Sequence, residues 1–144
     1  MALLSNKGLE KYDAKILLAW GESIDGNSKI TQWFMKNSYI ELGLFHYALR
    51  NEKRSREWLL NNGYPHLMAL INGIEGRQNA LVWLKTHGYD ILHEMALIGD
   101  NDDNAFRTLM RPETQVYAML AKKMAFIKNE IEENNRDIHK FDPN

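Results

Sequence analysis

One stretch of the chain repeats at an interval of 25 residues, and this repeat limits the possible folds more than any other feature. The segment from Trp58 reads WLLNNGYPHLMALINGIEG, and the segment from Trp83 reads WLKTHGYDILHEMALIGDN. A third copy begins at Trp33, with Ser38 in place of the glycine. Self-similarity at a short fixed period is typical of stacked supersecondary units, each of which buries its apolar face against the next.

The apolar spacing within each copy predicts two short helices. Apolar side chains recur every three or four residues, and no alternation typical of strands persists. We expect the first helix of each unit near 29–37, 54–62 and 79–87, and the second near 40–50, 65–75 and 90–99. Segment 14–27 is a fourth copy of the second helix. Helices of about ten residues are marginal alone, so the units must support one another.

Glycine and asparagine mark the ends of these helices. Gly63 and Gly88 follow the first helix of their units, where a left-handed backbone suits glycine. The second helices are followed by Gly26, Asn51, Gly76 and Asn101, and glycine and asparagine tolerate that conformation best. We expect positive φ angles at Gly63, Gly76 and Gly88, and a modified turn at Ser38. We also expect the three repeated tryptophans to be substantially buried, in register.

These features predict an all-α fold, a multihelical superhelix (a short α-solenoid) of helical-hairpin repeats of about 25 residues with a longer C-terminal capping helix. We expect a single domain over 1–144, with repeats in 14–111, the C-terminal helix in 112–135 and a polar tail in 136–144. The C-terminal helix carries apolar residues three and four apart: Tyr117, Leu120, Met124, Ile127 and Ile131. Two roles remain open for it, capping of the array within the chain and homodimerisation with a second copy.

The W-L-x-x-x-G-Y units, seen at Trp58 and Trp83, give the chain a resemblance to known proteins. It resembles a family of small, uncharacterised all-helical bacterial proteins with short helical-hairpin repeats. The resemblance implies a multihelical superhelix and implies no activity.

Composition excludes several classes of function. A formal net charge of −1 provides no basic field, so we expect no nucleic-acid partner. The chain has no cysteine, which excludes disulfides, thiolate metal sites and cysteine nucleophiles. Its apolar runs are shorter than the roughly 18 residues that span a bilayer, and polar residues interrupt any secretory signal, so we expect no membrane partner and a cytoplasmic location.

Metal and cofactor sites find little support in the sequence. Asp100, Asp102 and Asn104 occupy the first, third and fifth positions of a calcium-loop pattern, but the position of the bidentate glutamate holds Arg111. A polar turn with Asp103 as the N-cap of the next helix explains this segment better. The five histidines form no H-x-x-x-H pair. We therefore expect no metal, no cofactor and no catalytic residue.

One surface remains as a candidate binding face. On the second helices, the side opposite the expected core carries residues that differ from unit to unit, and we call them the ladder: Tyr47, Met68, Asn72, His93 and Leu97. Repeat proteins bind partners through such extended surfaces. The alternative is that the N-terminal segment or the C-terminal helix covers the ladder.

The leading functional hypothesis is a non-catalytic protein-interaction or scaffold module, not an enzyme, with an unidentified protein partner. One alternative is a small hydrolase or ligand-binding protein with a pocket between the hairpins and the C-terminal helix. A further alternative is a self-assembling structural protein. A deep closed pocket with two perturbed titratable groups would favour the enzyme, and an open apolar groove would favour the module.

Overall fold

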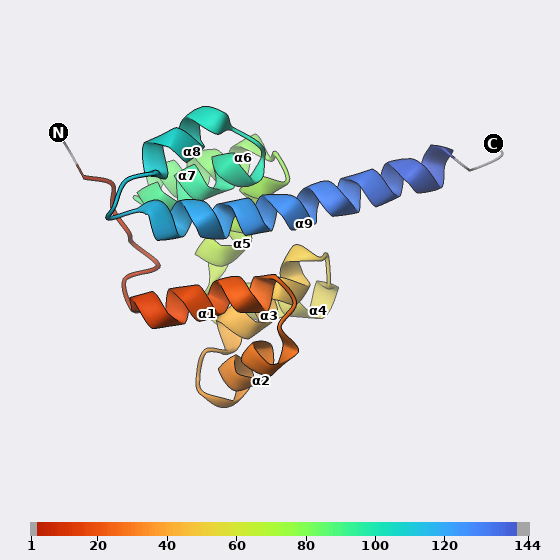
Figure 1. Ribbon diagram of the computed structural model, residues 1–144, viewed down its shortest axis with the longest axis horizontal. Coiled ribbons are helices and arrows are strands. Elements are labelled where there is room, and N and C mark those ends of the chain that lie inside the picture. The colour runs from red at the N-terminus through yellow and green to blue at the C-terminus, as the bar shows by residue number, and fades with distance from the viewer. Residues whose placement is uncertain (1–2, 141–144) are drawn as a thin grey trace.

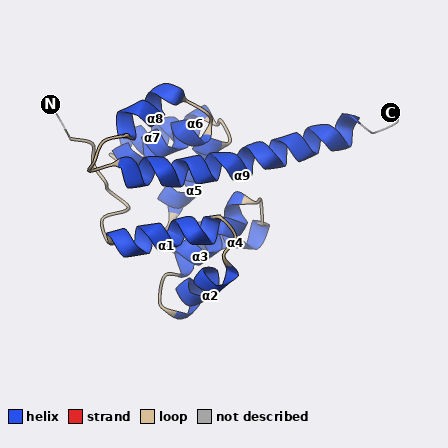
Figure 2. Ribbon diagram, viewed as in Figure 1, coloured by secondary structure: helices blue, strands red, loops and turns tan. Residues whose placement is uncertain are grey.

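A computed structural model describes residues 3–140 of the backbone and the side chains of residues 3–136. Within these residues the chain forms nine α-helices and no strand, as Figures 1 and 2 show. The helices are α1 (Ala14–Ile24), α2 (Ser28–Lys36), α3 (Ile40–Leu49), α4 (Lys53–Asn61), α5 (Pro65–Ile74), α6 (Gln78–Thr86), α7 (Asp90–Gly99), α8 (Asp103–Leu109) and α9 (Gln115–Lys140). The prediction of an all-α protein is confirmed.

Helix α9 differs from its predicted bounds at both ends. It begins at Gln115 and not at Pro112, because residues 112–114 form a turn. It continues to Lys140, so part of the expected polar tail is helical, while residues 141–144 lie outside the described part of the chain.

The turns between helices repeat as the sequence predicts. Gly63, Gly76 and Gly88 have φ angles of 90°, 86° and 81°, as expected for left-handed residues after a helix. The expected modified turn at Ser38 is wrong, because Ser38 adopts the same conformation with a φ of 68°. The next amide then donates to the carbonyl five residues earlier, as from Tyr39 to Phe34 over 3.0 Å. This hydrogen bond closes the same cap whether serine or glycine precedes it.

The expected burial of the repeated tryptophans is wrong. Trp33 is 45% exposed, and Trp58 and Trp83 are half-buried. Each indole instead stacks on the tyrosine six residues later, with ring centroids 5.5–6.0 Å apart: Trp33 on Tyr39, Trp58 on Tyr64 and Trp83 on Tyr89. The helix cap explains this contact, because it folds the residue after the turn back onto the last turn of the helix. The residue after each tryptophan enters the core and is fully buried: Phe34, Leu59 and Leu84.

The core lies between α9 and the second helices of the repeat units, which are α1, α3, α5 and α7. Side chains 25 residues apart on α1, α3, α5 and α7 are all fully buried: Trp20, Phe45, Leu70 and Met95. Helix α9 contacts these four helices and lies between α7 and α1 in Figure 1. Its Met124 and Ile127 are 0% and 3% exposed. The residues predicted to cap the array or form a dimer seam are therefore packed within the chain.

Residues 5–12, which we call the strap, cross the N-terminal ends of α7, α5 and α3, where they lie against Asp90, His66 and Glu41. The backbone of Ser5 pairs with α7, since its amide donates to Asp90 Oδ2 over 2.9 Å and its carbonyl accepts from the Ile91 amide over 3.0 Å. Lys7 Nζ donates to the carbonyl of His87 at the end of α6 over 2.8 Å. Farther along the strap, Leu9 is fully buried. The strap thus ties the start of the chain to three successive hairpins.

Candidate functional site

Only part of the ladder is exposed to solvent. Tyr47 is 39% exposed, and Met68 is 5% exposed and belongs to the core. Asn72, His93 and Leu97 are half-buried. The structure brings Met68 and Asn72 together in one hollow, which Tyr47, His93 and Leu97 do not line.

The packing of α2 on α3 explains why the ladder is half-buried. A Cβ atom built on Gly43 would lie 2.8 Å from Met35 Sδ and 3.2 Å from the Thr31 carbonyl oxygen. This side of the second helix therefore faces the first helix of its own hairpin. Met68 occupies the position of Gly43 in the next unit, and it lines a hollow together with Leu60 of α4.

The hollow that contains Met68 and Asn72 lies between α4, α5 and α6, and we call it the hairpin groove. Its volume is about 300 Å³, and it opens widely to solvent. Leu60 and Trp83 form apolar parts of its wall, and Asn72, Arg77 and Asn79 contribute polar groups. Leu60 is 54% exposed, so a large apolar side chain is available at this groove.

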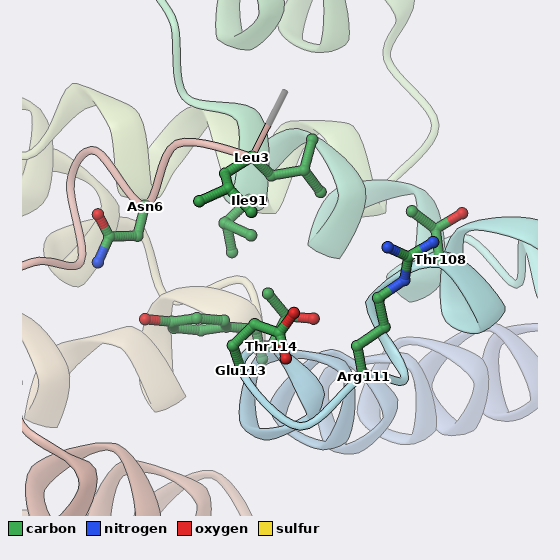
Figure 3. A pocket seen from close by; sticks show the side chains of 9 residues that line it. Leu3, Asn6, Ile91, Thr108, Arg111, Glu113 and Thr114 are labelled. Carbon is green, nitrogen blue, oxygen red and sulfur yellow. The ribbon is translucent and has the colours of Figure 1, made fainter. Parts of the chain in front are cut away.

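A second hollow lies between the beginning of the chain, α7 and the α8–α9 connection, and we call it the end hollow. It has a volume of about 360 Å³ and a largely apolar wall. In Figure 3, Leu3 and Ile91 face Glu113 and Thr114 across it, and Arg111 lies beside Thr108. Thr114 Oγ1 donates to the Leu109 carbonyl over 2.7 Å, which fixes the connection that forms one wall.

A buried polar cluster joins the strap to α3. The Glu41 carboxylate is 1% exposed and accepts from the Tyr12 hydroxyl over 2.5 Å. Lys11 Nζ lies 2.9 Å from Glu41 Oε2 and donates to the Tyr64 hydroxyl over 3.2 Å. No local sequence pattern indicates this cluster, because Tyr12 and Glu41 are 29 positions apart.

The electrostatics of this cluster oppose proton transfer near neutral pH. Burial, the hydrogen bond to Glu41 and its charge raise the pKa of Tyr12 far above its usual range. Burial lowers the pKa of Lys11, but the hydrogen bonds and charges of Glu41 and Tyr64 outweigh it and raise the pKa overall. Tyr12 therefore stays neutral and Lys11 stays charged, so neither matches a general acid or base that works near pH 7.

The described histidines show no metal site. Burial is the largest effect at His46, His66 and His93, and it lowers the pKa of each. No group of three His, Asp or Glu residues in the described part of the chain could hold a metal ion. His66 instead stacks on Tyr89, with ring centroids 5.2 Å apart.

The segment that partly matches a calcium-loop pattern contains the start of α8 and an ion pair. The N-cap of α8 is Asp102, whose side chain accepts from the Ala105 amide over 3.0 Å. The expected cap at Asp103 is thus one residue too late, because Asp103 already has helical geometry. Asp100 Oδ1 pairs with Lys128 Nζ over 2.8 Å and fastens α9 to the end of α7.

None of the described helices has the length and apolar character needed to cross a bilayer. Comparison of the chain with known protein families, curated protein sequences and solved structures finds no match in any of the three. The function is therefore inferred from the geometry of the chain itself.

Proposed function

We propose that the chain is a short α-solenoid and serves as a non-catalytic protein-interaction module. Three observations support the solenoid: left-handed turns recur at equivalent positions, the tryptophan–tyrosine stack occurs three times, and core positions match at 25-residue intervals. Repeat arrays of this kind present grooves between successive units, and such grooves commonly bind proteins.

The hairpin groove is the observation that carries the proposal. It combines an exposed leucine, Leu60, and the half-buried indole of Trp83 with the polar groups of Asn72, Arg77 and Asn79. Interfaces concentrate their binding energy where an apolar side chain enters such a pocket and polar groups surround it. We propose that the partner is a protein segment with one bulky apolar side chain next to a carboxylate, which the Arg77 guanidinium would bind.

The polar groups with shifted pKa values support a binding module more than an enzyme. Lys11, Tyr12, His46, His66 and His93 line neither the hairpin groove nor the end hollow. The hairpin groove is open and is not a closed cavity. An active site would bring perturbed titratable groups together in a pocket that excludes water.

The test is selection of peptides from a random display library on the intact protein, followed by affinity measurement in solution. We expect selected peptides to share a bulky apolar residue next to an acidic one. Leu60→Glu should weaken their binding about tenfold or more, and Arg77→Ala should weaken it severalfold, since one truncated hot-spot contact typically costs 1–2 kcal/mol or more.

Leu18→Glu is the matched control, because Leu18 is 65% exposed on α1 and does not line the hairpin groove. This variant should bind the selected peptides like the unmodified protein. If all selected peptides bind Leu60→Glu with unchanged affinity, the hairpin groove is not the binding site.

A second candidate function is small-molecule binding in the end hollow. Its volume of about 360 Å³ falls at the lower end of the range typical of ligand pockets. Ile91→Trp would fill the hollow from α7. A fragment screen by NMR should find small molecules that perturb Thr108 and Thr114 in the unmodified protein and not in this variant; fragments that bind both equally would exclude the hollow.

A further inference from the structure

The outward face of α9 carries a row of exposed apolar and charged side chains. Two contacts border this row: Lys122 Nζ lies 4.6 Å from the centroid of the Phe106 ring of α8, and Met119 shares a hollow with Leu18 of α1. We call the row the α9 stripe, and its members are Gln115, Met119, Lys122, Phe126, Glu130 and Glu133. All are exposed, and the two apolar members, Met119 and Phe126, are 51% and 68% exposed. Spacings of four and three residues place them along one line of a helix.

The stripe is distinct from the seam predicted from the sequence. The predicted seam contained Met124, Ile127 and Ile131, and in the structure the first two are buried in the core of the same chain. In Figure 1, α9 passes in front of α5, and its second half extends beyond the other helices. The face that remains available to a partner is therefore the one opposite the seam.

Polar contacts on both edges of α9 hold the helix in this orientation. Lys123 pairs with Asp25 at the end of α1, and Lys128 pairs with Asp100 at the end of α7. The side-chain amides of Asn129 and Asn101 exchange two hydrogen bonds of 3.0 Å. These contacts restrict rotation of α9 about its axis, so Met119 and Phe126 cannot turn inward without breaking them.

The charged residues of the stripe favour a second copy of α9 as the partner, in antiparallel orientation. Lys122 lies four residues before Phe126 and Glu130 lies four residues after it. If two copies of α9 pair antiparallel with Phe126 opposite Phe126, the Lys122 of each copy lies opposite the Glu130 of the other. Parallel pairing would place Lys122 against Lys122 and Glu130 against Glu130, which is repulsive.

We propose that the protein forms a two-fold symmetric homodimer through the α9 stripe, with the helices antiparallel and centred on Phe126. A two-fold interface is self-complementary, so each cross-helix contact occurs twice. Helix α9 has 26 residues and is about 39 Å long, which allows several turns of contact. This surface is independent of the hairpin groove, so the dimer and the proposed peptide binding can be tested separately.

The experiment measures the mass of the full-length protein by light scattering and its dimer dissociation constant by sedimentation equilibrium. The unmodified protein should give twice the chain mass of 16.8 kDa. A monomer at every concentration up to about 1 mM, where only very weak association escapes detection, overturns the proposal.

A charge exchange tests the direction and register of pairing. Lys122→Glu and Glu130→Lys should each weaken the dimer about tenfold or more, because each replaces two attractive contacts by two repulsive ones. The double variant Lys122→Glu/Glu130→Lys should recover dimerisation to within about threefold of the unmodified protein, because its pairs are attractive again. A dimer that both single variants leave unchanged, or that the double variant fails to restore, overturns this register.

Phe126→Ala tests the centre of the interface. It removes an exposed side chain, so the monomer should keep its helical circular dichroism while the dimer weakens about tenfold or more. Val82→Glu is the matched control, since Val82 is 63% exposed on α6, away from the stripe, and this variant should remain dimeric. Equal dimer affinities for Phe126→Ala and the unmodified protein would contradict an interface centred on Phe126.

Discussion

Replacing Tyr12 by phenylalanine measures how much the hydrogen bond between the Tyr12 hydroxyl and the buried Glu41 carboxylate contributes to stability. The hydroxyl-to-carboxylate distance is 2.5 Å, and Tyr12 and Glu41 are 5% and 1% exposed. A hydrogen bond to a charged group contributes about 1.5–3 kcal/mol net, and the substitution keeps the aromatic ring in place. We expect Tyr12→Phe to lower the free energy of unfolding by about 2 kcal/mol.

Lys11→Met provides the matched comparison, since it removes the second partner of the same carboxylate. The Lys11 side chain is 52% exposed, so solvent screens its ion pair with Glu41. We expect a loss of no more than about 1 kcal/mol. Tyr12→Phe should therefore destabilise the protein clearly more than Lys11→Met does.

A double-mutant cycle with Glu41→Leu separates the hydrogen bond from the other effects of each substitution. Glu41→Leu also removes a favourable negative charge from the first turn of α3, and the cycle cancels that contribution. We expect a coupling energy between Tyr12 and Glu41 of about 1 kcal/mol or more. Urea unfolding followed by circular dichroism gives each free energy, with an unchanged slope m as the sign of two-state behaviour. A coupling energy near zero, or equal losses from Tyr12→Phe and Lys11→Met, would refute the assigned role of the hydrogen bond.

Three further predictions concern packing, turns and pH. Gly73→Ala places a Cβ atom 2.7 Å from Ala96 Cβ and should lower the free energy of unfolding in urea by about 1–3 kcal/mol. Adding Ala96→Gly to this variant should recover part of the loss, and additive losses from the two substitutions would contradict the clash. Gly88→Val at a φ of 81° should lower stability by more than about 1 kcal/mol, while Gly88→Asn should cost less, and equal costs would exclude backbone strain as the cause. Burial lowers the folded-state pKa of His46, His66 and His93 below the ordinary 6.5. Below that pH the unfolded chain binds more protons than the folded chain, so the free energy of unfolding should fall on acidification from about pH 7 to about pH 5. The urea midpoint should therefore decrease from about pH 7 to about pH 5, and replacing each of these histidines singly by glutamine should make the decrease smaller. A midpoint that rises on acidification would contradict the inferred burial of the three side chains.

The repeat was sufficient to predict the short helices and most of their turns, and the turn at Ser38 is the exception. Period and turn residues are local properties, so the bounds of the short helices fall within about one residue of the expected ones. The tryptophans show where this reasoning fails. Their recurrence indicated equivalent environments, and Trp33, Trp58 and Trp83 do have equivalent stacking partners. Recurrence alone did not distinguish stacking on the surface from burial in the core.

The strap and the Glu41 cluster could not be predicted in the same way. Residues 1–12 show weak periodicity, yet Leu9 and Tyr12 are buried, because they pack against helix ends from distant parts of the chain. Glu41 lies on a helix whose pattern alone marks it as an exposed acid of the first turn. Its burial follows from the arrival of Tyr12, a contact without any signature in the sequence near either residue.

The position of the strap also determines the order in which the chain can be completed during synthesis. The hydrogen bonds of Ser5 join it to Asp90 and Ile91, so a growing chain cannot form them until the third hairpin has left the ribosome. Helix α1 can pack on α2 and α3 early, but its contacts with α9 form only after α9, which follows the other described helices, has been made. The strap is therefore completed only after α7 has been made, and until then its segment around Ser5 remains open to chaperones or to other nascent chains.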